Sequence, residues 1–286
     1  MNTRSIIVLD IGGTKINFGR FQGGMIQQNQ ILPFPAHASA EEIFAFIIHC
    51  IDLVKLDDTE AIAIGVPCIV DIEQGIVFNA VNIPAWQQYP LKSLLQAHYQ
   101  LPVYINNDVN CFVAGESAYG TAKHYQNVAG ICLGTGFGCG LFVNQQLYAG
   151  QNCCAGEVGG IRYLDATIDD YCSGQYFIDH YQVSGAELAQ RADAGDVRAL
   201  AAFEQFAGHL ANAISHLLLV IDPQVIVIGG SVANSYHLFI DALWRELANF
   251  PYPVVIENLT ICQSELADAA LLGAASLYLH HHSEIH

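Results

Sequence analysis

The chain has 286 residues, of which 52% are hydrophobic and only 13% are charged, and 10 Lys and Arg against 27 Asp and Glu give a formal charge of −17. Such a charge repels phosphate backbones and anionic membranes, which disfavours nonspecific nucleic-acid binding and membrane docking. The hydrophobic content excludes a disordered chain. Because the sequence has no signal-peptide pattern and no apolar stretch of ~20 residues, we expect a soluble cytoplasmic protein without a membrane helix.

The nine cysteines are best interpreted as reduced thiols that pack as small hydrophobic side chains. They form no Cys-x-x-Cys motif and no paired Cys/His spacing of the kind that zinc sites use. The sequence therefore predicts no zinc site.

Strand-like and helix-like segments alternate along the first part of the chain. Residues 5–10 form a continuous apolar run, Gly12-Gly13 turns the chain, and residues 15–21 alternate polar and apolar side chains, which predicts a hairpin. Ser39 followed by Glu42 predicts the capping box of a helix. We expect further strands at residues 61–66 and 103–105 and a helix at residues 109–117.

The second part repeats this opening. A buried strand at residues 128–133 runs into a glycine-rich loop at residues 134–140 and a strand at 141–143, so strand, glycine turn and strand recur after about 120 residues. The repeat favours two related α/β domains. The remaining predicted elements are a helix at 197–220, a strand at 225–228, a helix at 236–249, strands at 254–256 and 259–262, a helix at 268–279, and a frayed end at 279–286.

Three glycine clusters each follow an apolar strand directly: Gly12-Gly13, the segment with Gly134 and Gly136, and Gly229-Gly230. Glycine lets the backbone approach a ligand closely and leaves N–H groups free to bind an anion, so the clusters are candidate phosphate sites. The alternative for any single cluster is a tight hairpin turn.

Two familiar nucleotide motifs are excluded by spacing. A Walker loop needs Gly-Lys-Ser/Thr, and the chain contains no Gly-Lys pair. The dinucleotide fingerprint needs a glycine at the sixth position counted from Gly134, where Cys139 stands.

The remaining motifs resemble, over nearly the full length, those of the ROK family of sugar kinases: Asp10-Ile11-Gly12-Gly13-Thr14-Lys15, Gly65-Val66-Pro67, Asn82-Ile83-Pro84-Ala85-Trp86, Asn107-Asp108, Gly134-Thr135-Gly136, Gly156-Glu157-Val158-Gly159 and Ile228-Gly229-Gly230. The resemblance implies an α/β protein of two actin-like (ribonuclease H-like) domains, with ATP and a sugar meeting in an interdomain cleft. Ser231 and the ending at residues 268–274 are similar to N-acetylmannosamine kinases of that family.

By this resemblance Asp108 is the catalytic base, which takes the proton of the sugar hydroxyl. Its alternative role is the N-cap of the following helix. Asn107 is expected to bind a sugar hydroxyl, unless it serves only as a strand-end turn, and Gly65 is placed on the substrate side.

The nucleotide side of the predicted site combines glycines, hydroxyls and one acid. Asp10 is expected to hold Mg²⁺ through water, or else to cap the turn that follows it. Thr14 and Thr135 are expected to donate hydroxyl groups to the nucleotide, with ordinary solvated strand ends as their alternative. The backbone of Gly12, Gly13, Gly134, Gly136, Gly229 and Gly230 completes the predicted ATP site.

The chain departs from the family pattern in one region. The family's zinc-binding His and Cys cluster are missing together, because Gly160 follows Gly159 and residues 161–167 contain no Cys. This indicates a zinc-free branch. Glu157 is still expected to bind sugar hydroxyls, and Asp169 stands where the family has a sugar-binding Glu, although both acids are alternatively solvated loop residues.

The sequence thus predicts an ATP-dependent kinase that phosphorylates the 6-hydroxyl of a hexose or N-acetylhexosamine. The alternative is a non-catalytic, sugar-sensing regulatory protein of the same family. We expect residues 1–118 with 268–282 to form a smaller domain and 119–267 a larger one, with a hinge near residues 115–123. A homodimer follows from the resemblance alone.

Overall fold

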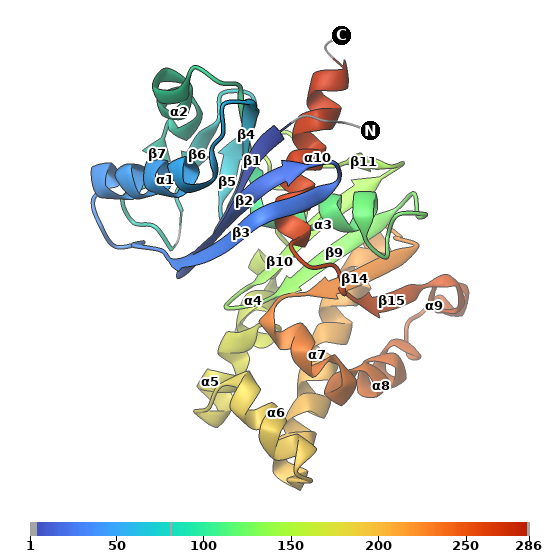
Figure 1. The fold of residues 1–286 in the computed structure, drawn as a ribbon. Coiled ribbons are helices and arrows are strands. Elements are labelled where there is room, and N and C mark those ends of the chain that lie inside the picture. Colours follow the sequence, from blue (N-terminus) through green and yellow to red (C-terminus); the bar gives the residue numbers. More distant parts are fainter. Residues whose placement is uncertain (1–4, 81, 285–286) are drawn as a thin grey trace. The chain divides into compact units, whose positions relative to one another are not determined.

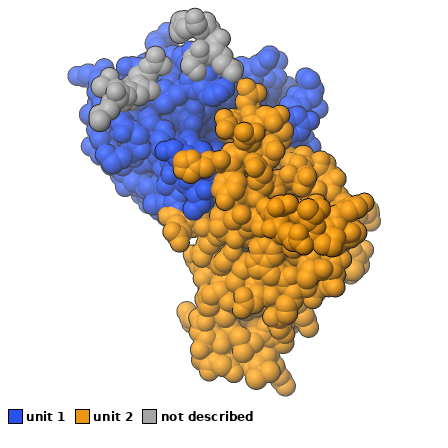
Figure 2. Space-filling view, turned by 90° about the vertical axis from the view of Figure 1, so that its right-hand side faces the viewer, with its two compact units in different colours: residues 1–123, 147–155, 266–286 blue, residues 124–146, 156–265 orange. Residues whose placement is uncertain are grey.

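The computed structural model describes residues 5–80 and 82–284. Its contacts divide the chain into two compact units, residues 1–123, 147–155 and 266–286 as unit 1 and residues 124–146 and 156–265 as unit 2 (Figure 2). The chain therefore leaves unit 1 after Lys123 and crosses again at 146/147, 155/156 and 265/266. The domain bounds and the hinge expected from the sequence stay predictions.

Unit 1 is built on a five-stranded sheet of order β3-β2-β1-β4-β8 (Figure 1). Its strands are β1 (Ser5–Ile11), β2 (Lys15–Gln22), β3 (Met25–Pro33), β4 (Thr59–Val66) and β8 (Val103–Asn107). The predicted hairpin is β1 and β2, which pair antiparallel, whereas β4 lies parallel to β1 and β8 parallel to β4. A smaller sheet contains β5 (Ile69–Asp71), β6 (Ile76–Phe78) and β7 (Gln88–Tyr89).

The described residues of unit 1 form the helices α1 (Ala40–Val54), α2 (Leu91–Tyr99), α3 (Asp108–Tyr119) and α10 (Ala269–Glu284). The expected capping box of α1 is confirmed, since Ser39 Oγ accepts from the Glu42 N–H and the Glu42 carboxylate accepts from the Ser39 N–H. Alternate residues of β1 and β4 pack into one apolar core with α1 and α2. The side chains on the opposite face of these strands therefore pack against α3 and α10.

Unit 2 repeats this strand order as β11-β10-β9-β14-β15. The strands are β9 (Val128–Leu133), β10 (Phe137–Val143), β11 (Gln146–Leu147), β14 (Val225–Gly229) and β15 (Thr260–Gln263). As in unit 1, the first two strands form an antiparallel hairpin and the next two add in parallel. The internal repeat predicted from the sequence is therefore a repeat of sheet topology.

The helices of unit 2 are α4 (Ile168–Tyr171), α5 (Gly174–Tyr181), α6 (Gly185–Asp193), α7 (Val197–Val220), α8 (Tyr236–Leu247) and α9 (Pro253–Asn258), with short 3-10 turns η1 (Val158–Gly160) and η2 (Ser231–Ser235). A two-residue hairpin, β12 (Arg162–Tyr163) and β13 (Ala166–Thr167), precedes α4. The bounds predicted for α7 are confirmed.

Three local predictions are wrong. The glycine-rich loop ends at Gly136, because Gly138 and Gly140 belong to β10 and pair with Cys132 and Gly130. Residues 254–256 are helical, since Pro253 occupies a first helical position, which its fixed φ favours. The segment expected to be a frayed end is helical as part of α10 up to Glu284, and the ring of its His282 packs on the ring of Tyr278. Residues 285–286 of this prediction lie outside the described residues.

Helices α3 and α10 approach each other through glycines. A Cβ added to Gly273 would lie 1.6 Å from the Cys111 carbonyl oxygen, and one added to Gly115 would lie 2.0 Å from the Ala269 oxygen. Only residues without a Cβ fit at these two points. This contact fixes the position of α3, which carries Asp108 at its first turn.

Candidate active site

Asp10 and Asp108 of unit 1 lie on the same face of its sheet. Successive side chains of a strand point to opposite faces, and this alternation decides on which face Asp10 lies. Ile7, Leu9 and Ile11 of β1 point into the core with α1, so Asp10 points to the other face of the sheet. Gly65 is the register partner of Asp10 on β4 and faces the same way. Helix α3 begins at Asp108, directly after β8, and packs on this face.

The distances confirm that Asp10, Gly65 and Asp108 are neighbours. A Cβ built on Gly65 would lie 3.3 Å from Asp108 Cα and 3.6 Å from Asp10 Oδ1. Burial, followed by the negative charges of Asp10 and Asp108, raises the pKa of the Cys111 thiol on the same helix. The Asp10 carboxylate and the backbone of Asp108 thus lie on one side of a glycine at the end of the sheet.

The two acids differ in their surroundings. Burial raises the pKa of Asp10 to about 6, and the positive charge of Lys15 counteracts part of this effect. Asp108 is partly exposed, and its Oδ1 accepts from the Val109 N–H at 2.9 Å.

The N-cap of α3 is Asn107, which corrects the alternative role suggested for Asp108. Asn107 Oδ1 accepts from the N–H groups of Val109 and Asn110 at 2.9 and 3.0 Å, and its Nδ2 donates to the Cys68 carbonyl at 3.4 Å. The cap orients the first turn of α3 and with it the Asp108 side chain.

The first glycine cluster is the turn between β1 and β2. The Gly12 N–H donates to the Lys15 carbonyl at 2.9 Å, and a Cβ on Gly13 would lie 2.8 Å from Asn82 Cβ. Thr14 and Lys15 are exposed. The Asn82 motif therefore packs against the glycine turn, which explains why both motifs occur in one sequence.

In unit 2 the turn between β9 and β10 contains Gly134, Thr135 and Gly136, and the Gly134 N–H closes it on the Gly136 carbonyl at 3.0 Å. Asp169 lies against this turn, with its Oδ1 accepting from the Phe137 N–H. Desolvation raises the pKa of Glu157, and Asp169 lies close enough for its negative charge to raise this pKa further.

The third cluster meets the second at the ends of neighbouring strands. Gly229 ends β14 beside β9, and Gly230 has φ +87°, a conformation that L side chains rarely adopt. A Cβ on Gly230 would lie 2.4 Å from the Leu133 carbonyl oxygen. The two glycine clusters of unit 2 are therefore adjacent.

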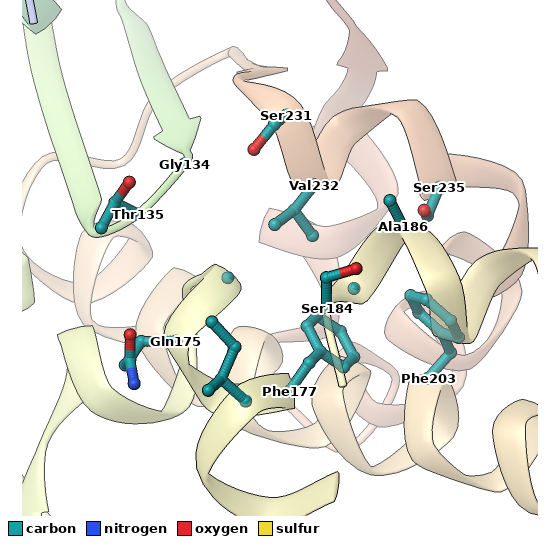
Figure 3. A pocket seen from close by; sticks show the side chains of 13 residues that line it. Gly134, Thr135, Gln175, Phe177, Ser184, Ala186, Phe203, Ser231, Val232 and Ser235 are labelled. Atoms are coloured by element: carbon teal, nitrogen blue, oxygen red, sulfur yellow. The ribbon is translucent and has the colours of Figure 1, made fainter. Parts of the chain in front are cut away.

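A pocket of about 220 Å³ opens beside these clusters (Figure 3). Phe177 and Phe203, whose ring centroids are 5.0 Å apart, contribute to its apolar wall. Thr135 and Gln175 lie on one side of the pocket, and Ala186 and Phe203 lie on the other. Its other lining residues among those described are Gly134, Gly174, Ile178, Ser184, Gly185, Ser231, Val232 and Ser235, and no lining residue is charged.

Sequence reasoning missed the part of this pocket that α5 and α6 supply. Both helices start with Ser-Gly, and Ser173 and Ser184 accept from the N–H groups of Gln175 and Glu187 as N-caps. This repeated pair, 11 residues apart in the sequence, was the available signal. It marks two helix N-termini, but only the fold brings both to the turn at Gly134.

Two absences apply to residues 5–80 and 82–284. No three side chains of His, Cys, Asp or Glu in this part of the chain come together as a candidate metal site. None of the helices in the same residues is long and apolar enough to cross a membrane.

Comparisons with known proteins identify the class. The chain is 31% identical over 257 residues to an N-acetyl-D-glucosamine kinase of Escherichia coli, covering 79% of this chain and 83% of that protein. A ROK family glucokinase of Streptomyces griseus, solved in complex with glucose and AMPPNP, is 26% identical, with a TM-score of 0.82 and coverage of 96% of this chain and 98% of that one. A putative N-acetylmannosamine kinase of Listeria monocytogenes, 24% identical, shares the fold with a TM-score of 0.85, covering 97% and 99% of the two chains.

These relatives confirm the predicted fold class of two actin-like, ribonuclease H-like domains, and they make the protein an ATP-dependent carbohydrate kinase. The sequence profile of the ROK family matches residues 6–281, and the chain belongs to this family. The regulatory alternative is accordingly disfavoured.

Asp10 gives a prediction about stability. Because burial raises its pKa from 3.8 to about 6, the folded protein binds this proton more tightly than the unfolded chain, and the free energy of unfolding should fall as pH rises through this window. Asp10→Asn removes this charge. Because Asp10 is partly accessible to solvent, the full shift is discounted, and the variant should be about 1–2 kcal/mol more stable than wild type at pH 7.

Urea denaturation of both proteins at pH 7 and at pH 4 measures this difference. The difference should shrink strongly at the lower pH, because Asp10 is then protonated in the folded protein and close to its ordinary pKa of 3.8 in the unfolded chain. A stability difference that is absent at pH 7, or the same at both pH values, would contradict the assignment.

Proposed function

We propose that the protein transfers the γ-phosphoryl group of ATP to the 6-hydroxyl of a hexose or N-acetylhexosamine, with N-acetylglucosamine and glucose as the first candidates. The N-acetylglucosamine kinase and glucokinase relatives support this choice of acceptors. The reaction class follows from the family, whereas the acceptor position and the sugar are part of the proposal.

One observation carries the chemistry: Asp10 and Asp108 flank Gly65 on the same face of the sheet. In our proposal the Asp108 carboxylate takes the proton of the sugar hydroxyl as that oxygen bonds to the γ-phosphorus. The bond between the γ-phosphorus and the bridging oxygen breaks, and ADP leaves with the electron pair. Gly65 supports this step because a Cβ there would lie 3.3 Å from Asp108 Cα, a tight contact with the backbone at the start of α3.

For the nucleotide, we assign the uncharged pocket of unit 2 to the nucleoside and the glycine turns to the phosphates. A neutral pocket with aromatic walls suits a base, which is apolar on its faces and polar at its edge. The turns that contain Gly12, Gly13, Gly134, Gly136, Gly229 and Gly230 would surround the phosphate oxygens, helped by Thr14 and Thr135. The N–H groups of Gly12 and Gly134 close these turns, so the other backbone N–H groups would be the phosphate donors. Asp10 would hold Mg²⁺ through water, and the ion would neutralise charge on the phosphates.

For the sugar, we assign Asn107, Glu157 and the space beside Gly65. Asn107 stands next to the proposed base, and Glu157 is an exposed acid close enough to Asp169 that this neighbour's charge helps to raise its pKa. A carboxylate of this kind is able to accept hydrogen bonds from sugar hydroxyls. We further propose that the enzyme needs no zinc, acts as a homodimer and works in the cytoplasm, where ATP is available. These three points rest on the family resemblance and the cysteine pattern.

The test is ADP release from Mg-ATP in a coupled assay with a panel of hexoses and N-acetylhexosamines, followed by identification of the phosphorylated hydroxyl by NMR. We expect N-acetylglucosamine or glucose to give the highest kcat/KM, with phosphate on the 6-position. Excess chelator should abolish nucleotide binding, because a protein with a formal charge of −17 has few cationic side chains to neutralise the phosphates of ATP without Mg²⁺. The proposal fails if no sugar stimulates ADP release, and its Mg²⁺ part fails if ATP binds tightly in chelator.

A further inference from the structure

Asn106, the last residue but one of β8, lies on the same face of the unit 1 sheet as Asp10. Ile105 points into the core with α1, so Asn106 next to it points to the opposite face. Gly65 is the register partner of Asn106 on β4, and Asp10 is the register partner of Gly65 on β1. A Cβ on Gly65 would lie 3.3 Å from Asp108 Cα, so α3 starts directly over this row of three residues.

The side chain of Asn106 is fully buried and hydrogen-bonded at both its oxygen and its nitrogen. The oxygen accepts from the Asn107 N–H at 2.8 Å, from Asn110 Nδ2 at 3.0 Å and from the Cys153 thiol at 3.7 Å. The nitrogen donates to the Tyr104 hydroxyl at 3.0 Å. A buried amide that is paired at both ends is held in one orientation. This side chain therefore connects β8, the first turn of α3 and the segment that carries Cys153.

Cys153 closes the network from a separate part of the chain. Residues 147–155 belong to unit 1, although the chain on both sides of them belongs to unit 2. The Cys153 sulfur also accepts from Asn110 Nδ2 at 3.4 Å. Cys153 has φ +55°, a left-handed conformation that is strained in a non-glycine residue. In this conformation its buried thiol contacts the side chains of both Asn106 and Asn110.

The network fixes the chain on both sides of Asp108. Asn107, which precedes it, donates its N–H to Asn106, and Asn110, two residues after it, donates its side-chain amide to the same oxygen. Asp108 itself is partly exposed, and its Oδ1 accepts from the Val109 N–H. Asn106 thus acts on Asp108 through its neighbours in the chain, and the Asp108 carboxylate stays on the partly exposed side.

We propose that Asn106 is a positioning residue for Asp108: its amide holds the junction of β8 and α3 so that the carboxylate meets the sugar hydroxyl in the geometry for proton transfer. The proposal rests on the function proposed above, in which Asp108 takes that proton. A displacement of about 1 Å at such a junction is enough to lower a rate about 100-fold. A neutral amide holds the junction without adding a third negative charge near Asp10 and Asp108, which would raise the pKa of both.

The experiment is a double-mutant cycle on kcat with Asn106→Ala, Asp108→Asn and the double variant, at saturating sugar and Mg-ATP. Asn106→Ala should lower kcat about 10- to 100-fold and leave the KM for Mg-ATP within about twofold, because the base is misplaced and the glycine turns are unchanged. In the Asp108→Asn background the same substitution should change kcat less than about twofold, since no base remains to be misplaced. End-point detection of the sugar phosphate measures these low rates.

Thr59→Ala is the control for loss of a buried polar group far from the proposed base. Thr59 starts β4, at the opposite end of the strand from Gly65, and its Oγ1 accepts from the Leu56 N–H at 3.1 Å. This variant should melt at a lower temperature than wild type and keep the wild-type kcat while it is folded. The inference is overturned if Asn106→Ala has the kcat of the control, or if its loss is the same with and without Asp108.

A second variant decides the question if Asn106→Ala does not fold. Asn110→Ala removes one donor to Asn106 and places a better helix former inside α3. Its kcat should fall about fivefold, the effect of one hydrogen bond, and only where Asp108 is present. If wild type releases no ADP with any sugar, or Asp108→Asn keeps more than a tenth of the wild-type kcat, the proposed function fails and the inference falls with it. An inactive Asp108→Asn beside a fully active Asn106→Ala overturns the inference alone, so the two failures are distinguishable.

Discussion

Asp108→Asn should lower kcat by about 10²–10⁴-fold, the range for loss of a general base, while both KM values stay within a few fold. An amide oxygen at this position still accepts from the Val109 N–H, which Asp108 Oδ1 does at 2.9 Å, so the start of α3 is preserved. An amide cannot take the proton of a sugar hydroxyl. The expected variant is therefore folded and binds both substrates, but it is nearly inactive.

The measurement is steady-state ADP release at saturating sugar and Mg-ATP, together with a thermal melt of each protein. Asp71→Asn is the matched control, since Asp71 is another unit 1 aspartate whose Oδ1 accepts from a backbone N–H, that of Gln74 at 2.9 Å. We expect its kcat to equal that of wild type. If Asp108→Asn keeps more than a tenth of the wild-type kcat, Asp108 is not the base.

Gly273→Ala should destabilise the protein by about 3 kcal/mol, at the upper end for overpacked cores. The new methyl group would lie 1.6 Å from the Cys111 carbonyl oxygen and 2.7 Å from the Gly115 nitrogen, and both are backbone atoms of α3. Backbone inside a helix cannot move aside as a side chain can, so α3 and α10 must separate. Because α3 begins with Asp108, catalytic activity should fall together with stability.

Gly208→Ala in α7 is the matched control, because no atom beyond the neighbouring residues and backbone of α7 itself lies within 4 Å of the added Cβ. There the same substitution should stabilise the protein by about 0.5–1 kcal/mol, through the higher helix propensity of Ala. Urea denaturation midpoints of the two variants should move in opposite directions from wild type. Equal shifts would mean that the close approach of α3 and α10 does not contribute to stability.

Much of the site was predictable, because its parts occur as contiguous motifs. The glycine turns directly follow the apolar strands β1 and β9, and the acids at 10 and 108 stand at the ends of β1 and β8. The resemblance to the ROK family shows that these motifs occur in the order typical of that family. The pocket beside the glycine turns of unit 2 was not predicted, since the repeated Ser-Gly marks only the starts of α5 and α6 and does not show that Phe177 and Phe203 line one cavity. Amphipathic helices show which face is buried, but not which pocket that face borders.

The sequence also did not predict which hydrogen bonds the polar residues of these motifs form. Both Asn107 and Asp108 are good N-cap residues, and only the path of the chain from β8 into α3 assigns the cap to Asn107. Likewise, an acid at 169 is equally compatible with a sugar hydroxyl and with a backbone N–H. The contact with Phe137 exists because Gly136 and Gly159 leave room for it.

The sequence by itself determined the family, the repeated strand order and the positions of the glycine turns, because strand periodicity and the conformational freedom of glycine are local properties of the chain. Only the tertiary structure decided which acids face each other, which residue caps α3 and where Asp169 points. Those features depend on segments far apart in the sequence, whose distances are set by the packing of helices against the sheets. A residue's type limits the bonds that it is able to form, and the fold selects the partner.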